Sequence, residues 1–169
     1  MRVNTVNPPP AARARVSVRE ATVADLDTVV ALRLALLREH GTNYIYKRLR
    51  ADAPQRARRL FGSQLASAHE VTYLAEQDGE VVGILRCVES VGSPLLYPDR
   101  YGYVSSVYVA PVARRRGVLK ALLARAVRWC EERDLSEIRL HSTSDGDSAN
   151  AAWSALGFAI VEHLRVKSI

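Results

Sequence analysis

Cysteine is scarce in this chain, and long hydrophobic runs are missing from it. The 169 residues include two cysteines, Cys87 and Cys130, which lie in apolar contexts without the paired spacing of a disulfide framework or a metal site. No apolar run approaches the roughly 18 residues that a membrane span needs. Residues 1–15 lack the apolar core of a secretory signal. We therefore expect no metal, no membrane contact and a cytoplasmic location.

Lysine is rare too, since it occurs only at positions 47, 120 and 167, and arginine supplies most of the positive charge. The formal net charge of +6 suits a nucleic-acid partner in principle. The basic residues are spread along the chain, however, apart from clusters at 114–116 and 48–59. We therefore expect no dedicated nucleic-acid binding. A basic module that uses these clusters and the N-terminal residues stays a rival hypothesis.

Residues 1–15 contain Asn7-Pro-Pro-Pro10 and scattered arginines, and we expect them to form a disordered extension. The remaining residues, 16–169, are expected to form a single domain, because this length suits one domain with a sizeable core. Hydrophobic side chains make up 48% of the chain and charged ones 25%, which is ordinary for a globular protein.

The spacing of apolar side chains predicts alternating strands and helices. A Thr22-x-x-Asp25 capping box opens the first helix, and the turn at 77–80 predicts a hairpin. The predicted strands cover residues 16–20, 71–76, 81–88, 103–109, 138–142 and 158–166; the predicted helices cover residues 22–41, 52–67 and 148–156, with a further helix after a basic loop at 114–117. This order predicts an α/β fold with a mixed central sheet and helices on both faces.

The most informative segment runs from residue 107 to residue 123 and contains a strand, a Pro-bearing turn, the basic loop and a helix. Backbone N–H groups at a helix N-terminus have no partner within the helix, and they attract anions. Here the N–H groups of residues 115–120 lie among the cationic side chains of 114–116 and Lys120. Gly117 lets the chain turn tightly. The segment therefore predicts a site for a phosphate-bearing ligand.

Two motifs in this order resemble a known family. Arg114-Arg115-Arg116-Gly117-Val118-Leu119 matches the pattern Arg/Gln-x-x-Gly-x-Gly/Ala except at its last position. Trp153-Ser-Ala-Leu-Gly157-Phe158 matches the end of a later pattern, Tyr-x-x-x-Gly-Phe, and has tryptophan in the tyrosine position. With these motifs and the order of elements over residues 16–166, the chain resembles the GNAT superfamily of N-acetyltransferases.

The resemblance implies a GNAT-type acyl-CoA N-acyltransferase fold and an acyltransferase that takes acetyl-CoA as co-substrate. The implied reaction is direct transfer of the acetyl group to a primary amine of a small molecule. By the same resemblance, the backbone of Val107, Tyr108 and Val109 pairs with the pantetheine arm of CoA. Residues 114–120, with Val118 and Lys120 at the helix start, bind its phosphates. A homodimer is compatible with the resemblance.

Three positions depart from the family pattern. Leu119 stands where relatives have a small residue, and its helical phase predicts that it points into the core with Leu122, Leu123, Ala126, Val127 and Cys130. Trp153 is too weak an acid to protonate the leaving thiolate, so we expect it to pack in the core or at the wall of the CoA site. The family's asparagine position holds Gly146, and Asn150, one helical turn later, is predicted to contact pantetheine instead. These departures leave one alternative, a CoA- or acyl-CoA-binding GNAT-fold module with little or no turnover.

The motifs assign no general base, although one is expected because the attacking amine must be neutral. His141, near the end of a predicted central strand, and Glu89, at the end of another strand, are the candidates. Glu39 and His40 close the first helix and are considered with them. All of these positions are also compatible with purely structural roles.

The acceptor site is expected between the segment 41–48 and the loop 92–102, which carries tyrosines at 97 and 101. The aromatic side chains suit a small amine with an apolar part. Arg48, Arg50 and Arg100 suit an acceptor that bears a carboxylate or a phosphate. The sequence leaves both possibilities open.

Overall fold

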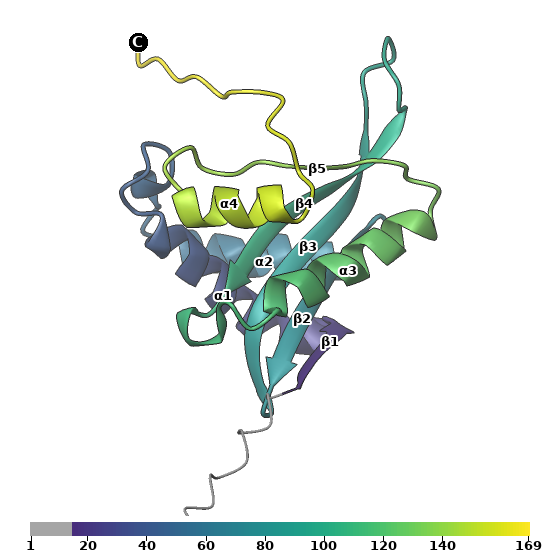
Figure 1. Ribbon diagram of the computed structural model, residues 1–169. Helices are drawn as coiled ribbons and strands as arrows, with labels where there is room; N and C mark the ends of the chain where they lie inside the picture. Colours follow the sequence, from purple (N-terminus) through teal and green to yellow (C-terminus); the bar gives the residue numbers. More distant parts are fainter. Residues whose placement is uncertain (1–14) are drawn as a thin grey trace, which may run out of the picture.

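The structure is a computed structural model that describes residues 15–169, and the predicted disordered extension lies almost entirely outside the described residues. One mixed sheet runs through the middle of the molecule, in the order β1-β2-β3-β4-β5 (Figure 1). Strands β1 to β4 are antiparallel to one another along the sheet, and β5 is parallel to β4. Their bounds are Val16–Glu20 (β1), Glu70–Gln77 (β2), Glu80–Val91 (β3), Arg100–Val109 (β4) and Ile138–Leu140 (β5).

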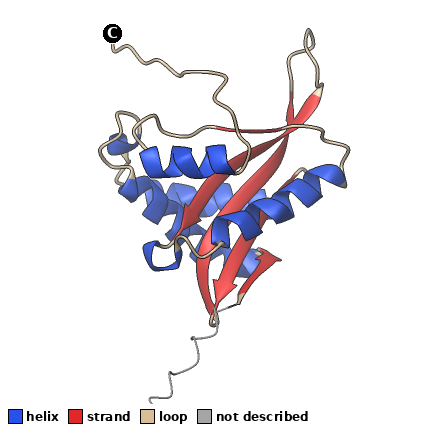
Figure 2. Ribbon diagram, viewed as in Figure 1, coloured by secondary structure: helices blue, strands red, loops and turns tan. Residues whose placement is uncertain are grey.

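Four α-helices cover the two faces of the sheet, as Figure 2 shows. On one face lie α1 (Leu26–Glu39) and α2 (Ala53–Leu65), and on the other lie α3 (Val118–Glu131) and α4 (Asp147–Ala155). Short 3₁₀ turns precede α1 and α3. This arrangement confirms the predicted α/β fold with a mixed central sheet and helices on both faces.

The core has two layers, one on each side of the sheet. Leu74 and Ile84 pack with α1 and α2, whereas Leu85, Val104 and Leu122 belong to the layer beneath α3. All five are almost fully buried. Because burying such a side chain contributes about 1.5–3 kcal/mol, these two layers fix the positions of α1 and α3 on the sheet.

The apolar stripe of α3 differs in part from the predicted one. Val118 occupies the first core position and Leu122, Ala126 and Cys130 follow it, whereas Leu119 is only half-buried and lies outside both core layers. Val127 is exposed. The reason is the phase of the helix, because a spacing of four residues from Val118 keeps these side chains on the sheet. The prediction that Leu119 and Val127 point into the core was wrong.

The end of the chain is the other departure from prediction. Residues 156–169 form no strand, although a strand was expected over 158–166. Apolar side chains such as Ile160 and Val161 are exposed. A strand needs a neighbour for its backbone hydrogen bonds, and β5 pairs only with β4 in the described part of the chain. β5 is therefore a short edge strand, and His141 follows an edge strand rather than a central one.

Cys87 and Cys130 meet in the core although their spacing predicts no pairing. Both thiols are buried and free, and their sulfur atoms lie 3.7 Å apart. They face Gly102 of β4, where a Cβ would approach the Sγ of Cys130 to 2.5 Å. Strand β4 can therefore pack against α3 at this position only with glycine.

The capping box before α1 is present and belongs to a larger ionic network. The backbone N–H of Thr22 donates to Oδ2 of Asp25 at 2.8 Å. Both Nη atoms of Arg19 donate to the same carboxylate at 2.8–2.9 Å, and its Nε donates to Glu76 of β2 at 2.7 Å. The bonds from Arg19 hold the pKa of Asp25 well below its usual value. The network therefore fixes the start of α1 to the edge of the sheet.

We expect Asp25→Asn to lower the free energy of unfolding at pH 7 by about 1 kcal/mol, because it removes the charge that Arg19 binds. A carboxyl whose pKa is lowered in the folded state stabilises the fold fully at any pH above its pKa in the unfolded chain, which is about 4. This contribution is lost as the pH falls from that value toward the pKa of the folded state. The difference between variant and wild type should thus shrink on acidification in urea titrations.

Asp27→Asn is the matched control. Asp27 pairs with Arg58, but its side chain is 78% exposed, so its loss should cost less than about 0.5 kcal/mol. Equal effects of the two substitutions at pH 7 would contradict the role assigned to Asp25.

Candidate functional site

The separation of β4 from β5 creates the most open part of the sheet. The two strands pair only where Gly102–Val104 meet Ile138–Leu140. Beyond that point the chain that follows β5 runs away from β4 (Figure 2). Residues 105–109 of β4 therefore have no strand neighbour on that side among the described residues. Apart from the Val109 carbonyl, which Arg114 binds at 2.9 Å, their backbone groups on this side can pair with an extended ligand.

A bulge shapes β4 at the start of this open edge. The register with β3 shifts between Ile84 and Arg86, and Ser106 adopts a positive φ of 54°. Farther along, Val107 and Val109 pack against the α3 layer, whereas Tyr108 packs on the opposite side against α1 and α2. The three side chains thus serve packing, and their backbone is the part that faces the open edge.

The basic loop leads directly from this edge to the start of α3. Arg115 and Gly117 both have left-handed backbone conformations, with φ of 60° and 86°. Gly117 is the N-cap of α3. The N–H groups of Val118, Leu119 and Lys120 belong to the first turn, where the helix offers them no acceptor. Successive N–H groups in such a turn form an anion-binding concavity.

The three arginines of the loop have different surroundings. Arg114 donates through Nε to the carbonyl of Val109 at 2.9 Å and through Nη2 to both carboxylate oxygens of Glu39 at 2.6–2.8 Å. Arg115 and Arg116 are exposed, as is Lys120, and within residues 15–169 they form no ion pair. Arg114 therefore holds the loop against β4 and α1, and the others are available to a ligand.

Helix α4 places the two remaining predicted cofactor residues. Trp153 is buried, and its ring meets that of Phe158 edge-on at 5.3 Å between centroids. Asn150 accepts a hydrogen bond from Ser142 at 2.6 Å and donates one to the carbonyl of Thr143 at 2.9 Å. Trp153 therefore packs, as expected, and the amide of Asn150 ties α4 to the loop after β5.

The two candidate bases have very different environments. Nδ1 of His141 and the hydroxyl of Tyr103 are hydrogen-bonded at 2.8 Å, across the point where β4 and β5 separate. Burial raises the pKa of Tyr103, which therefore stays neutral at physiological pH. Glu89 is bound by Arg100 at 2.5 Å, and this bond lowers the pKa of Glu89. A carboxylate with a lowered pKa is a poor base.

The other two residues near the end of α1 are also engaged. Glu39 is the partner of Arg114, and the ring of His40 lies 5.9 Å from that of Tyr46. Sequence reasoning missed Tyr103, because its contact with His141 spans 38 residues and follows from strand pairing alone.

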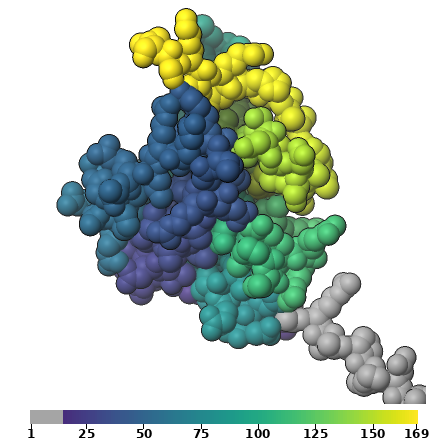
Figure 3. Space-filling model, turned by 90° about the vertical axis from the view of Figure 1, so that its left-hand side faces the viewer, coloured from purple at the N-terminus to yellow at the C-terminus, as the bar shows by residue number. Residues whose placement is uncertain are grey.

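Of the two segments expected to form the acceptor site, the first lines a cavity and the second does not. Tyr46, Arg48 and Arg50 line a cavity of about 370 Å³ between α1 and α2. Figure 3 shows the segment after α1 beside the segment between β5 and α4. In the other predicted wall, Tyr97 is 92% exposed and Arg100 is paired with Glu89. The first wall is therefore the better candidate.

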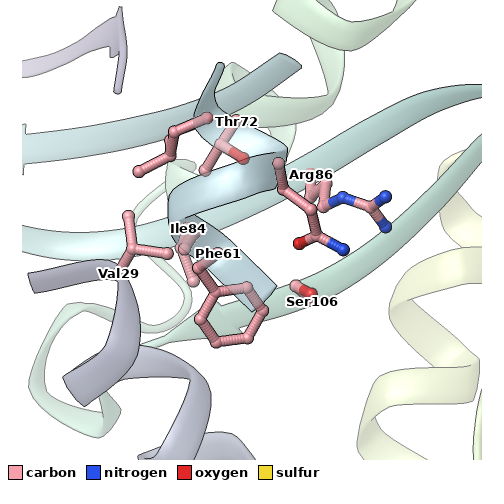
Figure 4. Close-up of a pocket in the computed structure, with 8 residues that line it drawn as sticks. Val29, Phe61, Thr72, Ile84, Arg86 and Ser106 are labelled. Carbon is pink, nitrogen blue, oxygen red and sulfur yellow. The ribbon is translucent and has the colours of Figure 1, made fainter. Parts of the chain in front are cut away.

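A second, much smaller cavity lies deeper, between α1, α2 and the sheet. It measures about 10 Å³ and is lined by residues such as Val29, Phe61 and Ser106 (Figure 4). This volume suits one water molecule at most. This inner cavity is thus too small for a substrate, and the outer cavity is the larger of the two. The described residues contain no cluster of three or more metal-ligating side chains, and none of their helices is long and apolar enough to cross a membrane.

Both the sequence and the fold of this chain are similar to those of known proteins. A sequence profile of the acetyltransferase (GNAT) family matches residues 34–158. The chain belongs to this family. It is therefore an acyltransferase, and its GNAT fold is the one that the two sequence motifs predicted. A comparison with curated proteins found no match.

Solved structures support the same GNAT fold. A predicted acetyltransferase from Clostridium acetobutylicum, solved with acetyl-CoA, aligns with a TM-score of 0.76 and 22% identity over 90% of this chain and 96% of that one. A GCN5-related N-acetyltransferase from Ralstonia eutropha aligns at 0.73 and 24% identity, covering 91% and 99%. An aminoglycoside 6'-N-acetyltransferase from Acinetobacter haemolyticus aligns at 0.73 and 21% identity, covering 90% and 97%.

The pair of Arg114 and Glu39 can be tested by a double-mutant cycle in this GNAT protein. We expect Arg114→Met and Glu39→Gln to show a coupling energy of about 0.5–1 kcal/mol in denaturant unfolding, since the side chains are 42% and 39% exposed and doubly hydrogen-bonded. The cycle for Arg128 and Glu132, which are 73% and 55% exposed, is the control and should give less. Equal coupling in the two pairs would show that Arg114 does not fasten the loop.

Proposed function

We propose that this GNAT acyltransferase moves the acetyl group of acetyl-CoA to a primary amine of a small molecule by direct transfer. The observation that carries the proposal is the continuous path from the open edge of β4, at residues 105–109, to the uncapped start of α3. The path offers backbone groups along its length and exposed cationic side chains at its end. An extended ligand with terminal phosphates matches this order of groups.

In this proposal the pantetheine arm pairs with the backbone of Val107–Val109, and the pyrophosphate lies on the N–H groups of residues 115–120. Each charge-assisted hydrogen bond contributes about 1.5–3 kcal/mol. Arg115, Arg116 and Lys120 supply additional positive charge. Arg114 acts indirectly, because its guanidinium is already bound to Glu39 and Val109.

The chemistry requires a neutral amine beside the thioester, at the point where β4 and β5 separate. We assign His141 as the general base. For Nε2 of His141 to accept a proton, Nδ1 must carry the hydrogen and donate it to the Tyr103 oxygen. The amine nitrogen then attacks the carbonyl carbon, the C–S bond breaks, and CoA leaves as a thiolate. Trp153 supplies no proton, so the thiolate takes one from water.

A covalent acetyl-enzyme is not part of the proposal. The hydrogen bond to Cys130, together with burial, raises the pKa of Cys87, so this thiol stays protonated. Both cysteines lie in the core and not at the open edge. Neither sulfur atom can therefore serve as the nucleophile.

The assignment of the loop predicts that Arg115→Ala/Arg116→Ala weakens acetyl-CoA binding about tenfold or more, since two cations near the phosphates are lost. Isothermal titration calorimetry at low and high salt measures this, and the loss should be smaller at high salt. Arg128→Ala, an exposed arginine at the far end of α3, is the control and should bind like wild type. Unchanged affinity of the double variant would contradict the assignment.

The assignment of His141 predicts that His141→Gln lowers kcat about a hundredfold near neutral pH. The loss should diminish as the pH rises toward the pKa of the acceptor amine, because a neutral amine needs no base. Thiol release from acetyl-CoA measures both quantities. A loss that is the same at every pH would make His141 a positioning residue.

The alternative, a protein that binds CoA with little turnover, is favoured by two observations. Leu119 is half-buried at the phosphate-binding turn, where relatives have a small residue, and Trp153 fills the tyrosine position. Calorimetry separates the two functions when it is combined with thiol release over a panel of amines. Tight acetyl-CoA binding without release for any amine would establish the alternative.

A further inference from the structure

The larger cavity, between α1, α2 and residues 45–50, is rich in positive charge. Its apolar floor includes Leu37 and Phe61, and the charged side chains that line it are Arg33, Arg48, Arg50 and Arg56. No carboxylate belongs to its lining. At about 370 Å³, it has the size of a small-molecule site.

Only part of this charge is neutralised within the described protein. Arg50 and Arg56 share one carboxylate, that of Asp52, at 3.1 and 2.7 Å. Arg48 lies over the ring of Tyr44, with its guanidinium carbon 4.3 Å from the ring centroid. The cavity thus has four guanidinium groups beside a single carboxylate.

Among the four arginines of the cavity, Arg33 has the fewest interactions that offset its positive charge. Its side chain is half-buried on α1, and among residues 15–169 it forms neither an ion pair nor a side-chain hydrogen bond. Burial lowers the pKa of Arg33, and the nearby positive charge of Arg86 lowers it further. A desolvated cation without a partner costs stability. A protein retains such a group most readily where a ligand supplies the missing charge.

Arg33 also connects the cavity to the proposed reaction centre. Arg33 lies on α1, which packs both against the turn that carries Tyr46 and against β4, the strand that carries Tyr103. Tyr103 in turn binds His141 where β4 and β5 separate. A molecule with its anionic end at Arg33 can therefore extend toward the base.

We propose that the acceptor is an aminocarboxylate: a primary amine joined through an apolar body to a carboxylate that Arg33 binds in this cavity. This inference rests on the proposed acetyl transfer and specifies its substrate. The guanidinium fork fits a carboxylate through two parallel hydrogen bonds, and the floor fits the apolar body. Polycationic amines such as aminoglycosides are disfavoured here by charge repulsion, although structural neighbours acetylate them.

The substrate preference is tested with three amines of similar length: 6-aminohexanoate, its uncharged primary amide, and a linear diamine. We expect kcat/KM for the carboxylate to exceed kcat/KM for the amide by about ten- to a hundredfold. The difference between the carboxylate and the diamine should be larger still. Arg33→Met should remove this preference by raising KM for the carboxylate while leaving the amide unaffected. Arg33→Lys, which retains charge without the fork, should restore part of it.

Arg58→Met is the matched control, because Arg58 lies on α2, pairs with Asp27 and does not line the cavity. It should leave the preference intact. A second readout is stability, since removal of a half-buried unpaired charge should leave the melting temperature of Arg33→Met unchanged or higher. A clear fall in melting temperature, with equal loss of activity for all three amines, would overturn the proposal and assign Arg33 a structural role.

Failure of the proposed acetyl transfer can be distinguished from failure of the proposed carboxylate site. If no amine is acetylated, calorimetry with 6-aminohexanoate and the CoA-bound protein still tests the cavity. Binding that is lost in Arg33→Met and retained in Arg58→Met would support the carboxylate site without turnover. Equal binding of the carboxylate and the amide to wild type would overturn it.

Discussion

Strand β4 loses its neighbour on one side after Val104, and most features of the candidate site depend on that loss. A paired β5 along the whole of β4 would close the edge that residues 105–109 leave open. It would also separate Tyr103 and His141 from any ligand, since their hydrogen bond marks the point of divergence. Residues 105–109 therefore lack backbone hydrogen bonds to a strand of the described chain on one side, and this side of the extended segment is exposed. The bulge at Ser106 occurs where this segment begins.

The loop that follows combines fixed and free arginines. Arg114 bonds to β4 and α1 and is part of the scaffold, whereas Arg115 and Arg116 face solvent. Three adjacent side chains of one chemical type thus have two different environments. Glu39 is the residue that makes this division, because it gives Arg114 a carboxylate and leaves none for its neighbours.

The fold followed from the sequence because its signals are local. Turn residues, the capping box and the apolar spacing of each element predicted the order of elements, and the motif at 114–119 located the turn between β4 and α3. Properties that depend on tertiary pairing were harder. The alternation over 158–166 predicted a strand, but no neighbour accepts its hydrogen bonds, and the stripe of α3 was shifted by one residue at Leu119. The contact between Tyr103 and His141 has no sequence signal, since it arises only when β4 and β5 pair.

The contact between Gly102, Cys87 and Cys130 has a consequence for the geometry of the open edge. Gly102 is the first residue of β4 that pairs with β5, opposite Ile138, and two sulfur atoms occupy the space that its side chain would need. The first point at which the strands are joined is thus also a point where β4 lies against α3 with no side chain between them. A larger side chain at either cysteine position would therefore press on β4 within the short segment that pairs with β5.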